Sequence, residues 1–307
     1  MIGAEFQHLL IEDPKSKTFG TFGVKHNVYE IHSRVLYGQG CFSFYRPIRH
    51  IFFELIDKHL FLQTDINQKG GKTMSRIFIT GDTHCDIDIH KLSTGAWPEQ
   101  KNLTREDVLI IAGDFGAPWT HPEDKTDQYI LKWHENKSYT TLFVDGNHEN
   151  FDALAAYPET VFANAKCHVI RPHVLHVQRG EVLQLKGHRI WCMGGAISDD
   201  REFRRALVSW WSQEKPNESE WQYAFDTLQK SRPDIIITHE TNEIAAYNFF
   251  HYPENNVSAH LNEALRIIWE QNLPVTDWYF GHHHTDFELE MHGIRYHAMY
   301  NKIAELK

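Results

Sequence analysis

The sequence predicts an α/β fold for most of the chain, and two observations carry this prediction. From Met74 onward, short runs of β-branched and other apolar residues recur at strand length. Such continuous runs are typical of strands that are covered on both faces. Each run also ends in a polar cluster containing Asp, Asn or His. Because ligands of α/β sheets bind beyond the carboxyl ends of the strands, we expect these clusters to form one site.

Five such strands occur in order along the chain. They and the clusters that follow them are Ile77-Phe78-Ile79-Thr80 with Gly81-Asp82-Thr83-His84, Val108-Leu109-Ile110-Ile111-Ala112 with Gly113-Asp114, Leu142-Phe143-Val144 with Asp145-Gly146-Asn147-His148-Glu149, Ile235-Ile236-Ile237-Thr238 with His239, and Trp278-Tyr279-Phe280 with Gly281-His282-His283-His284. A plain turn uses Gly or Asn because both tolerate positive φ. It does not require His or Glu, so these clusters indicate function.

Composition bounds the class of protein. The 307 residues are 41% hydrophobic and 13% aromatic, which is enough for a large core in one large domain or two unequal ones. The net charge of -10 argues against general nucleic-acid binding, so a nucleic acid is expected only as a substrate. The 4 cysteines form no CxxC pair, and neither a signal peptide nor an apolar run of about 18 residues is present. We therefore expect a cytoplasmic protein without a membrane partner; the sequence does not indicate an oligomeric state.

The first 73 residues differ from the rest. Apolar positions alternate like a strand around residues 29–37 and recur at helical spacing over residues 48–60, but no chemical motif is present. Residues 67–73 have the composition of a linker. We expect an N-terminal extension of unknown role at residues 1–73 and a catalytic domain at residues 74–307, which could begin at Met74 as a complete unit.

The side chains of the five clusters have the chemistry of a two-metal site. Carboxylate and amide oxygens together with imidazoles suit Mn, Fe, Zn or Co, whereas sites made only of oxygen suit Mg or Ca. Two neighbouring ions need a ligand that reaches both, and a carboxylate such as Asp114 can do this. A single Gly-Asp pair is a weak signal, but the ordered set of five is strong.

The ordered motifs resemble those of the calcineurin-like metallophosphoesterase superfamily, from about residue 75 to the C-terminus. The resemblance implies a two-sheet αββα sandwich, with the first 73 residues as an appendage. It also implies a ligand for every metal position: Asp82, His84 and His284 for one ion, Asn147, His239 and His282 for the other, and Asp114 bridging the two. By the same resemblance, His148 is the catalytic residue that faces the substrate and assists the leaving oxygen.

The activity that the resemblance implies is hydrolysis of a phosphate ester. Two divalent ions, with manganese expected, bind phosphate oxygens and stabilise a bridging hydroxide that attacks phosphorus in line. All seven implied ligands and His148 have competent residue types, which favours an enzyme over a binding module that has kept only the fold.

Departures from the family pattern narrow the expected substrate. Family protein phosphatases carry Asp-Arg-Gly at the second motif and an Arg before the third, and these arginines clamp a phosphomonoester. Here the second motif continues as Phe115-Gly116-Ala117, and Val144-Asp145 precedes the third. Ala117 also stands where the family pattern has an Asp that orients the histidine corresponding to His148. A phosphodiester is therefore expected, with a phosphomonoester as the alternative.

An arginine-rich segment has two interpretations. Arg201, Arg204 and Arg205, followed by Trp210-Trp211, could form a substrate lip above the metals, or a solvated helix with aromatic packing. We take Arg201 and Arg205 as substrate-binding candidates. His283 is left out of the ligand set, because an extended segment would point its side chain away from those of its neighbours.

Overall fold

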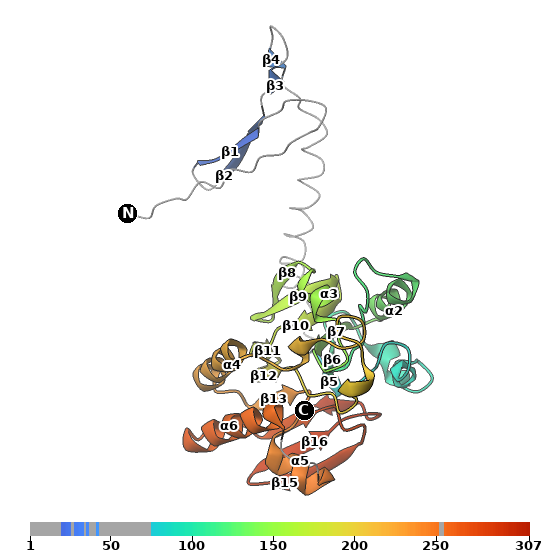
Figure 1. Ribbon diagram of the computed structural model, residues 1–307, viewed down its shortest axis with the longest axis vertical. Helices are drawn as coiled ribbons and strands as arrows, with labels where there is room; N and C mark the ends of the chain where they lie inside the picture. The colour runs from blue at the N-terminus through green and yellow to red at the C-terminus, as the bar shows by residue number, and fades with distance from the viewer. Residues whose placement is uncertain (1–19, 26–27, 34, 37–40, 43–74, 252–254) are drawn as a thin grey trace. The chain divides into compact units, whose positions relative to one another are not determined.

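The computed structural model describes residues 20–25, 28–33, 35–36, 41–42, 75–251 and 255–307 (Figure 1). The chain divides into two units, Met1–Lys72 and Thr73–Lys307. In the first, β1 (Gly20–Lys25) pairs antiparallel with β2 (Val28–Ser33), and β3 (Val35–Leu36) pairs antiparallel with β4 (Cys41–Phe42). The strand expected around residues 29–37 falls in part on β2 and β3. The helix expected over residues 48–60 and the linker lie outside the described residues.

The second unit contains a seven-stranded and a six-stranded sheet. The first has the order β17 (Ala304–Leu306), β5 (Ile77–Thr80), β6 (Val108–Ala112), β7 (Thr140–Val144), β10 (Val174–Val177), β9 (Ala165–Arg171), β8 (Glu159–Phe162). The second has the order β11 (Val182–Leu185), β12 (His188–Met193), β13 (Ile235–Thr238), β14 (Asp277–Phe280), β16 (Ile294–Ala298), β15 (Phe287–Met291). All five expected strands are present, as β5, β6, β7, β13 and β14.

Helices cover the outer faces of both sheets. Helices α2 (Lys125–Glu135) and α3 (Phe151–Ala155) pack on the first sheet, against strands that include β7, β9 and β10. Helix α4 (Glu218–Ser231) packs on β11 and β12 and also contacts α6 (Asn256–Glu270), which in turn contacts α5 (Glu243–Phe250). Short 3-10 turns lie at η1 (Ile89–Leu92), η2 (Pro98–Asn102), η3 (Arg201–Phe203) and η4 (Ser212–Glu214). The predicted αββα sandwich is confirmed. None of the helices in the described part is long and apolar enough to cross a membrane.

The continuous apolar runs arise because each strand contributes to two cores. Ile77 and Ile79 of β5 face the core between the sheets, where they join residues of the second sheet such as Ile237. Phe78, between them, faces the core on the other side of the first sheet. Since both faces are buried, every position of the strand gains by being apolar, at about 1.5–3 kcal/mol for each large side chain.

The strand directions bring the polar clusters to one edge. Strands β5, β6 and β7 are mutually parallel, and β13 and β14 are parallel in the second sheet. Parallel strands end at the same edge of a sheet, so the clusters after β5, β6 and β7 lie side by side. The backbone amide of Gly281, after β14, donates to His239 O at 3.1 Å, which links the two clusters of the second sheet.

Candidate metal centre

Four of the predicted metal ligands lie close together, and we call them the first group. Asp82 and His84 follow β5, Asp114 follows β6, and His284 follows β14. One ligand atom from each of the four lies within 4.8 Å of the others. Asp82 and Asp114 are buried. This cluster unites both sheets, because His284 comes from the second.

The remaining predicted ligands surround the other side of Asp114. His239 Nε2 lies 3.1 Å from Asn147 Oδ1 and 3.4 Å from Asp114 Oδ1. The His239 and His282 rings are 5.1 Å apart. The other carboxylate oxygen of Asp114, Oδ2, lies 3.1 Å from His84 Nε2. Asp114 thus faces both groups with different oxygens, as a bridging ligand requires.

Hydrogen bonds fix which ring nitrogen of two histidines faces the centre. The Nδ1 atom of His239 lies 2.8 Å from the carbonyl oxygen of Ala112, and the Nδ1 atom of His84 lies 2.7 Å from Asp88 Oδ2. Both partners accept hydrogen bonds, so each Nδ1 carries the proton. The Nε2 atoms face the centre, so each of these nitrogens could bind a metal ion in place of a proton, as a metal ligand must.

At two positions of the site only glycine fits, because a carboxylate oxygen lies too close for a side chain. A Cβ on Gly146 would lie 2.0 Å from Asp114 Oδ1, and one on Gly281 would lie 2.3 Å from Asp82 Oδ1. Any other residue would displace a carboxylate of the centre. This agrees with the expectation that the glycine before a ligand lets the backbone turn tightly toward the site.

The electrostatics of the centre favour a cation. Burial lowers the pKa of His239, but the nearby carboxylates of Asp114 and Asp82 outweigh it and raise that pKa to about 10. Among the described residues, no group donates a hydrogen bond to the buried Asp82 Oδ2. His284 Nε2 lies 3.3 Å from this oxygen, and a buried carboxylate oxygen that accepts no hydrogen bond is costly unless a positive charge faces it. Together with the mixed carboxylate, amide and imidazole donors, these features fit divalent metal ions.

Three acidic residues beside the ligands have identifiable structural roles. Asp88 binds His84 and also accepts from the Tyr300 hydroxyl at 2.9 Å. Glu149 is buried and accepts from the backbone amides of Phe115 and Gly116 at 2.8 and 3.2 Å, which holds the loop after Asp114. Burial, reinforced by the charge of Asp114, raises the pKa of Glu149 well above its usual value.

The third acidic residue, Asp145, belongs to a buried charge network. It accepts from Arg179 Nε and Nη2 at 2.8 and 2.6 Å, and His176 Nε2 lies 3.2 Å from its other oxygen. Arg179 also contacts Glu220 on α4 at 3.2 Å. Burial alone would raise the pKa of Asp145, but Arg179 and His176 hold it well below its usual value. The network ties the loop that carries Asn147 and His148 to a helix of the second sheet.

A buried lysine that no sequence motif indicated supports the first motif. Lys91 Nζ donates to the backbone oxygens of Gly81 and Asp82 at 2.9 and 2.6 Å, and to that of Tyr300. The Tyr300 ring stacks on His284 at 4.9 Å. Lys91 and Tyr300 therefore position ligands of the first group from opposite ends of the chain.

The centre opens into a small cavity that His148 lines. Its volume is about 160 Å³, and the residues around it are Asp114, Asn147, His148, Asp199, Asp200, His282 and His284. The backbone amide of His148 donates to Asp114 Oδ1 at 2.7 Å, so the position of this residue is coupled to the proposed bridging ligand. Its side chain faces the space where a substrate would meet the metals.

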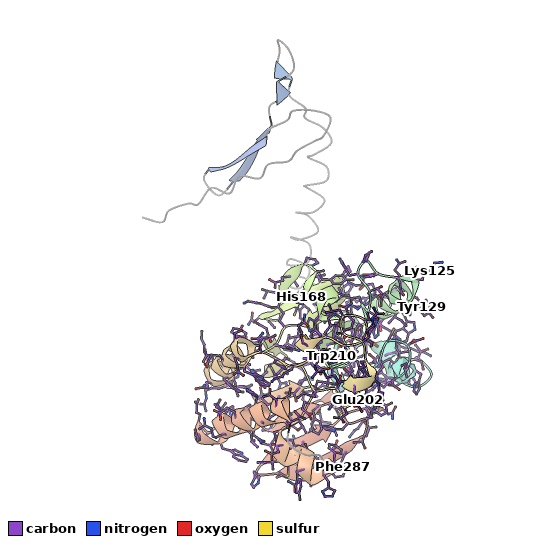
Figure 2. All side chains as sticks on the ribbon, in the orientation of Figure 1. Lys125, Tyr129, His168, Glu202, Trp210 and Phe287 are labelled. Carbon is purple, nitrogen blue, oxygen red and sulfur yellow. The ribbon has the colours of Figure 1, made fainter. Side chains whose placement is uncertain are left out.

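One arginine of the segment around residue 204 reaches this cavity. Arg204 Nη2 lies 3.1 Å from His148 Nε2, and Arg204 Nε is paired with Asp200. Arg201 instead stacks over the Trp210 ring at 4.3 Å, and Arg205 is exposed. Sequence spacing cannot distinguish the three, because the segment forms the short turn η3 and an irregular loop rather than a helix (Figure 2 labels Glu202 and Trp210 on it). The substrate roles of Arg201 and Arg205 stay predictions. Arg204 was not among the predicted substrate-binding residues, yet it is the arginine that contacts His148.

His283 does not point away from His282, because the segment is not extended: His282 and His284 have φ of 66° and 46°, and the His282 and His283 rings lie 5.1 Å apart. His283 Nε2 lies 2.9 Å from Glu240 Oε1, and its ring stacks on Phe250 at 4.1 Å. Glu240 also lies 3.7 Å from His282 Nε2. A carboxylate behind two histidines of the motif helps to hold that loop.

Comparison with known proteins places the chain in a family. The family model of the calcineurin-like phosphoesterases matches residues 75–286, and the chain belongs to this family. No curated protein shows significant sequence similarity to the chain. It is accordingly a metal-dependent phosphoric ester hydrolase of the metallophosphoesterase fold.

Three solved structures resemble parts of the chain. A phosphopantetheinyl hydrolase from Mycobacterium tuberculosis is 14% identical, with a TM-score of 0.38, over 75% of this chain and 91% of that one. A 5'-nucleotidase, described as putative, from Staphylococcus aureus is 13% identical, with a TM-score of 0.43, over 75% and 50%. The sulfate thiohydrolase SoxB of Thermus thermophilus is 8% identical, with a TM-score of 0.38, over 76% and 53%. The chain spans about half the length of the last two.

Proposed function

We propose that this hydrolase cleaves a phosphodiester. The observation that supports this is the lack of two arginines: Phe115 and Val144-Asp145 stand where the protein phosphatases of the family place them to clamp a phosphomonoester. A phosphomonoester carries one more negative charge than a diester at neutral pH and gains more from such a clamp. A site without that clamp suits the less charged ester.

The distances between the proposed ligands divide them into two sets, one for each ion, with Asp114 shared. Asp82, His84 and His284 would hold one ion, Asn147, His239 and His282 the other, and Asp114 both. Two divalent ions, with manganese proposed, would supply Lewis acidity toward phosphate oxygens and lower the pKa of a bound water.

The residues of the chain then have distinct tasks. In hydrolysis, a water oxygen bonds to phosphorus, the P–O bond to the leaving alcohol breaks, and that alcohol gains a proton. His148 faces the cavity and is assigned a hydrogen bond to the leaving oxygen. Arg204 can only donate hydrogen bonds, so a non-bridging phosphate oxygen is a natural partner for it beside His148.

Arg204 also supports a second candidate. A single arginine 3.1 Å from His148 could replace the missing clamp and allow a phosphomonoester. We retain the phosphodiester because one arginine, already paired with Asp200, supplies less positive charge than two unpaired ones.

The compartment proposed is the reducing cytoplasm. Cys85, Cys167 and Cys192 are free thiols in the described part of the chain. Burial raises the pKa of Cys192 above its usual value and that of Cys167 to about 12, so these thiols stay protonated and unreactive.

The test compares bis-p-nitrophenyl phosphate with p-nitrophenyl phosphate. The metal-stripped protein is reloaded with Mn²⁺, and kcat/KM is measured for both esters. A higher kcat/KM for the diester supports the proposal, and a higher value for the monoester favours the second candidate. If neither ester is cleaved, two bound ions would indicate an enzyme with a narrow natural substrate, and the lack of bound metal would indicate a binding module.

A further inference from the structure

The two loops that carry Arg204 and His84 present the most exposed large apolar side chains of the described residues. Phe203 is 84% exposed, Ile87 72% and Leu207 68%, the three highest values among large apolar residues there. Val208 adds a fourth side chain, 51% exposed. We call Phe203, Leu207 and Val208 the apolar lip. Exposed apolar clusters of this kind mark binding surfaces.

Both loops that present these side chains also carry residues of the site. Phe203 directly precedes Arg204, which contacts His148. Ile87 lies in the turn between His84 and Asp88, and its backbone amide donates to His84 O at 3.0 Å. Arg204 Nη1 also donates to Ser209 O at 3.0 Å, so the turn that carries Leu207 and Val208 lies against the same guanidinium that contacts His148.

Leu207 and Val208 of the lip lie in a hydrogen-bonded turn. The backbone amides of Val208, Ser209 and Trp210 all donate to Arg205 O, at 2.9 to 3.2 Å, and Leu207 N donates to Trp210 O at 2.8 Å. Leu207 has φ of 59°, a left-handed conformation that a bulky residue adopts only when its surroundings impose it. These contacts hold Leu207 and Val208 outward in a fixed arrangement.

The chemistry of the lip selects an aliphatic group next to an anion. Leu207, Val208 and Ile87 are aliphatic and Phe203 is aromatic, and none of the four has a group that could hydrogen-bond the edge of a nucleobase. Arg204 supplies positive charge at the cavity side of the same loop. An anionic head beside a hydrocarbon chain matches this pattern.

We infer that the substrate is an amphiphilic phosphate ester whose alkyl or acyl chain lies on the apolar lip while its phosphate occupies the metal centre. This inference rests on the proposed function, because it uses the same site. It adds that hydrocarbon length, and not only the phosphate, determines affinity.

Binding of non-hydrolysable phosphonates tests the inference without requiring turnover. The Mn²⁺-loaded protein is titrated calorimetrically with methylphosphonate and with octylphosphonate below its micelle concentration. Burial of several methylenes predicts that octylphosphonate binds about tenfold more tightly or better. In F203S/L207S the ratio of the two affinities is expected to fall to about twofold, because the serine side chains no longer cover the octyl chain.

The matched control is V161S on β8, because Val161 is 67% exposed, nearly as much as Leu207. V161S should keep the wild-type ratio, and F203A/V208S should lower it as a second lip variant. All these positions are exposed, so thermal unfolding should match that of the wild type and report intact folding.

Several results would overturn the inference. Equal affinity for both phosphonates in the wild type would do so, and so would a ratio that survives in both lip variants. Loss of vesicle binding in F203S/L207S, without any chain-length preference, would instead make the lip a membrane contact. Hydrolysis of the nitrophenyl esters by the wild type is measured separately, because that result tests the proposed function. Chain-length-dependent binding without any hydrolysis would contradict the proposed function but support the lip.

Discussion

Arg204 Nη2 lies 3.1 Å from His148 Nε2, so a loop distant in sequence from the metal motifs places a guanidinium beside the proposed catalytic histidine. Since a guanidinium only donates, this nitrogen of His148 accepts. The pair marks where two non-metal groups can reach the same phosphate.

Arg204→Met should lower kcat/KM for bis-p-nitrophenyl phosphate by about 10- to 100-fold, because a charged donor to the phosphate is lost. Bound metal should stay at two ions per chain. Arg189→Met, in an exposed residue of β12, is the control and should change kcat/KM by less than about twofold. Steady-state kinetics on both variants measure this, and similar losses in both would contradict the assignment.

Asp114→Asn should lose both bound metal and activity, because the neutral amide cannot bridge two cations as a carboxylate does. The buried side chain has nearly the same shape, so the fold should persist by circular dichroism. Metal content is measured by mass spectrometry after gel filtration. Full turnover in this variant would show that Asp114 is not the bridge.

His148→Ala should cut kcat by about 100-fold or more while leaving metal content nearly intact, since this residue is assigned to chemistry and not to ligation. The measurement pairs kcat with metal stoichiometry on the same sample. A proportional fall in both would instead assign His148 to the ligand set.

His134 predicts a pH dependence of stability away from the site. It is fully buried between Phe115 and Trp133, and neither ring nitrogen has a hydrogen-bond partner among the described residues. Burial lowers its pKa from 6.5 to about 3. Between these pH values the unfolded chain binds a proton that the folded chain does not, so the free energy of unfolding falls as pH decreases.

His134→Phe should remove up to about 4 kcal/mol of this loss between pH 6.5 and pH 3, and it should also stabilise the protein at pH 7. Urea unfolding at a series of pH values measures both effects. The exposed His90→Phe serves as the control. An unchanged pH slope in His134→Phe would mean that other groups dominate acid unfolding.

Arg179→Met should destabilise the protein by about 3–5 kcal/mol, because it leaves the buried Asp145 carboxylate with only His176 as a charged partner. Removing both charges in D145N/R179M should recover part of this loss, as measured by urea unfolding. The exposed Arg189→Met is the matched control. Additive effects of the two single changes would show that the pair is not coupled.

The strands and predicted ligands could be read from the sequence because each strand is buried on both faces. Ile77 to Thr80 and Val108 to Ala112 had to be apolar, so the polar residues after them stood out. Arg204 and Lys91 could not be found this way. Each reaches its partner from an irregular turn, where side-chain direction depends on tertiary contacts and has no period that spacing could reveal.

Strand β17 has a consequence for the order of assembly. It pairs antiparallel with β5, the strand that leads into Asp82, and Arg76 beside β5 binds Glu305 of β17. During synthesis β5 is among the first strands of the catalytic unit to emerge, yet its outer edge stays uncovered until residue 306 has left the ribosome. Throughout translation this edge offers unpaired backbone groups to other nascent chains, so a chaperone that shields β-edges would protect the chain best during this interval.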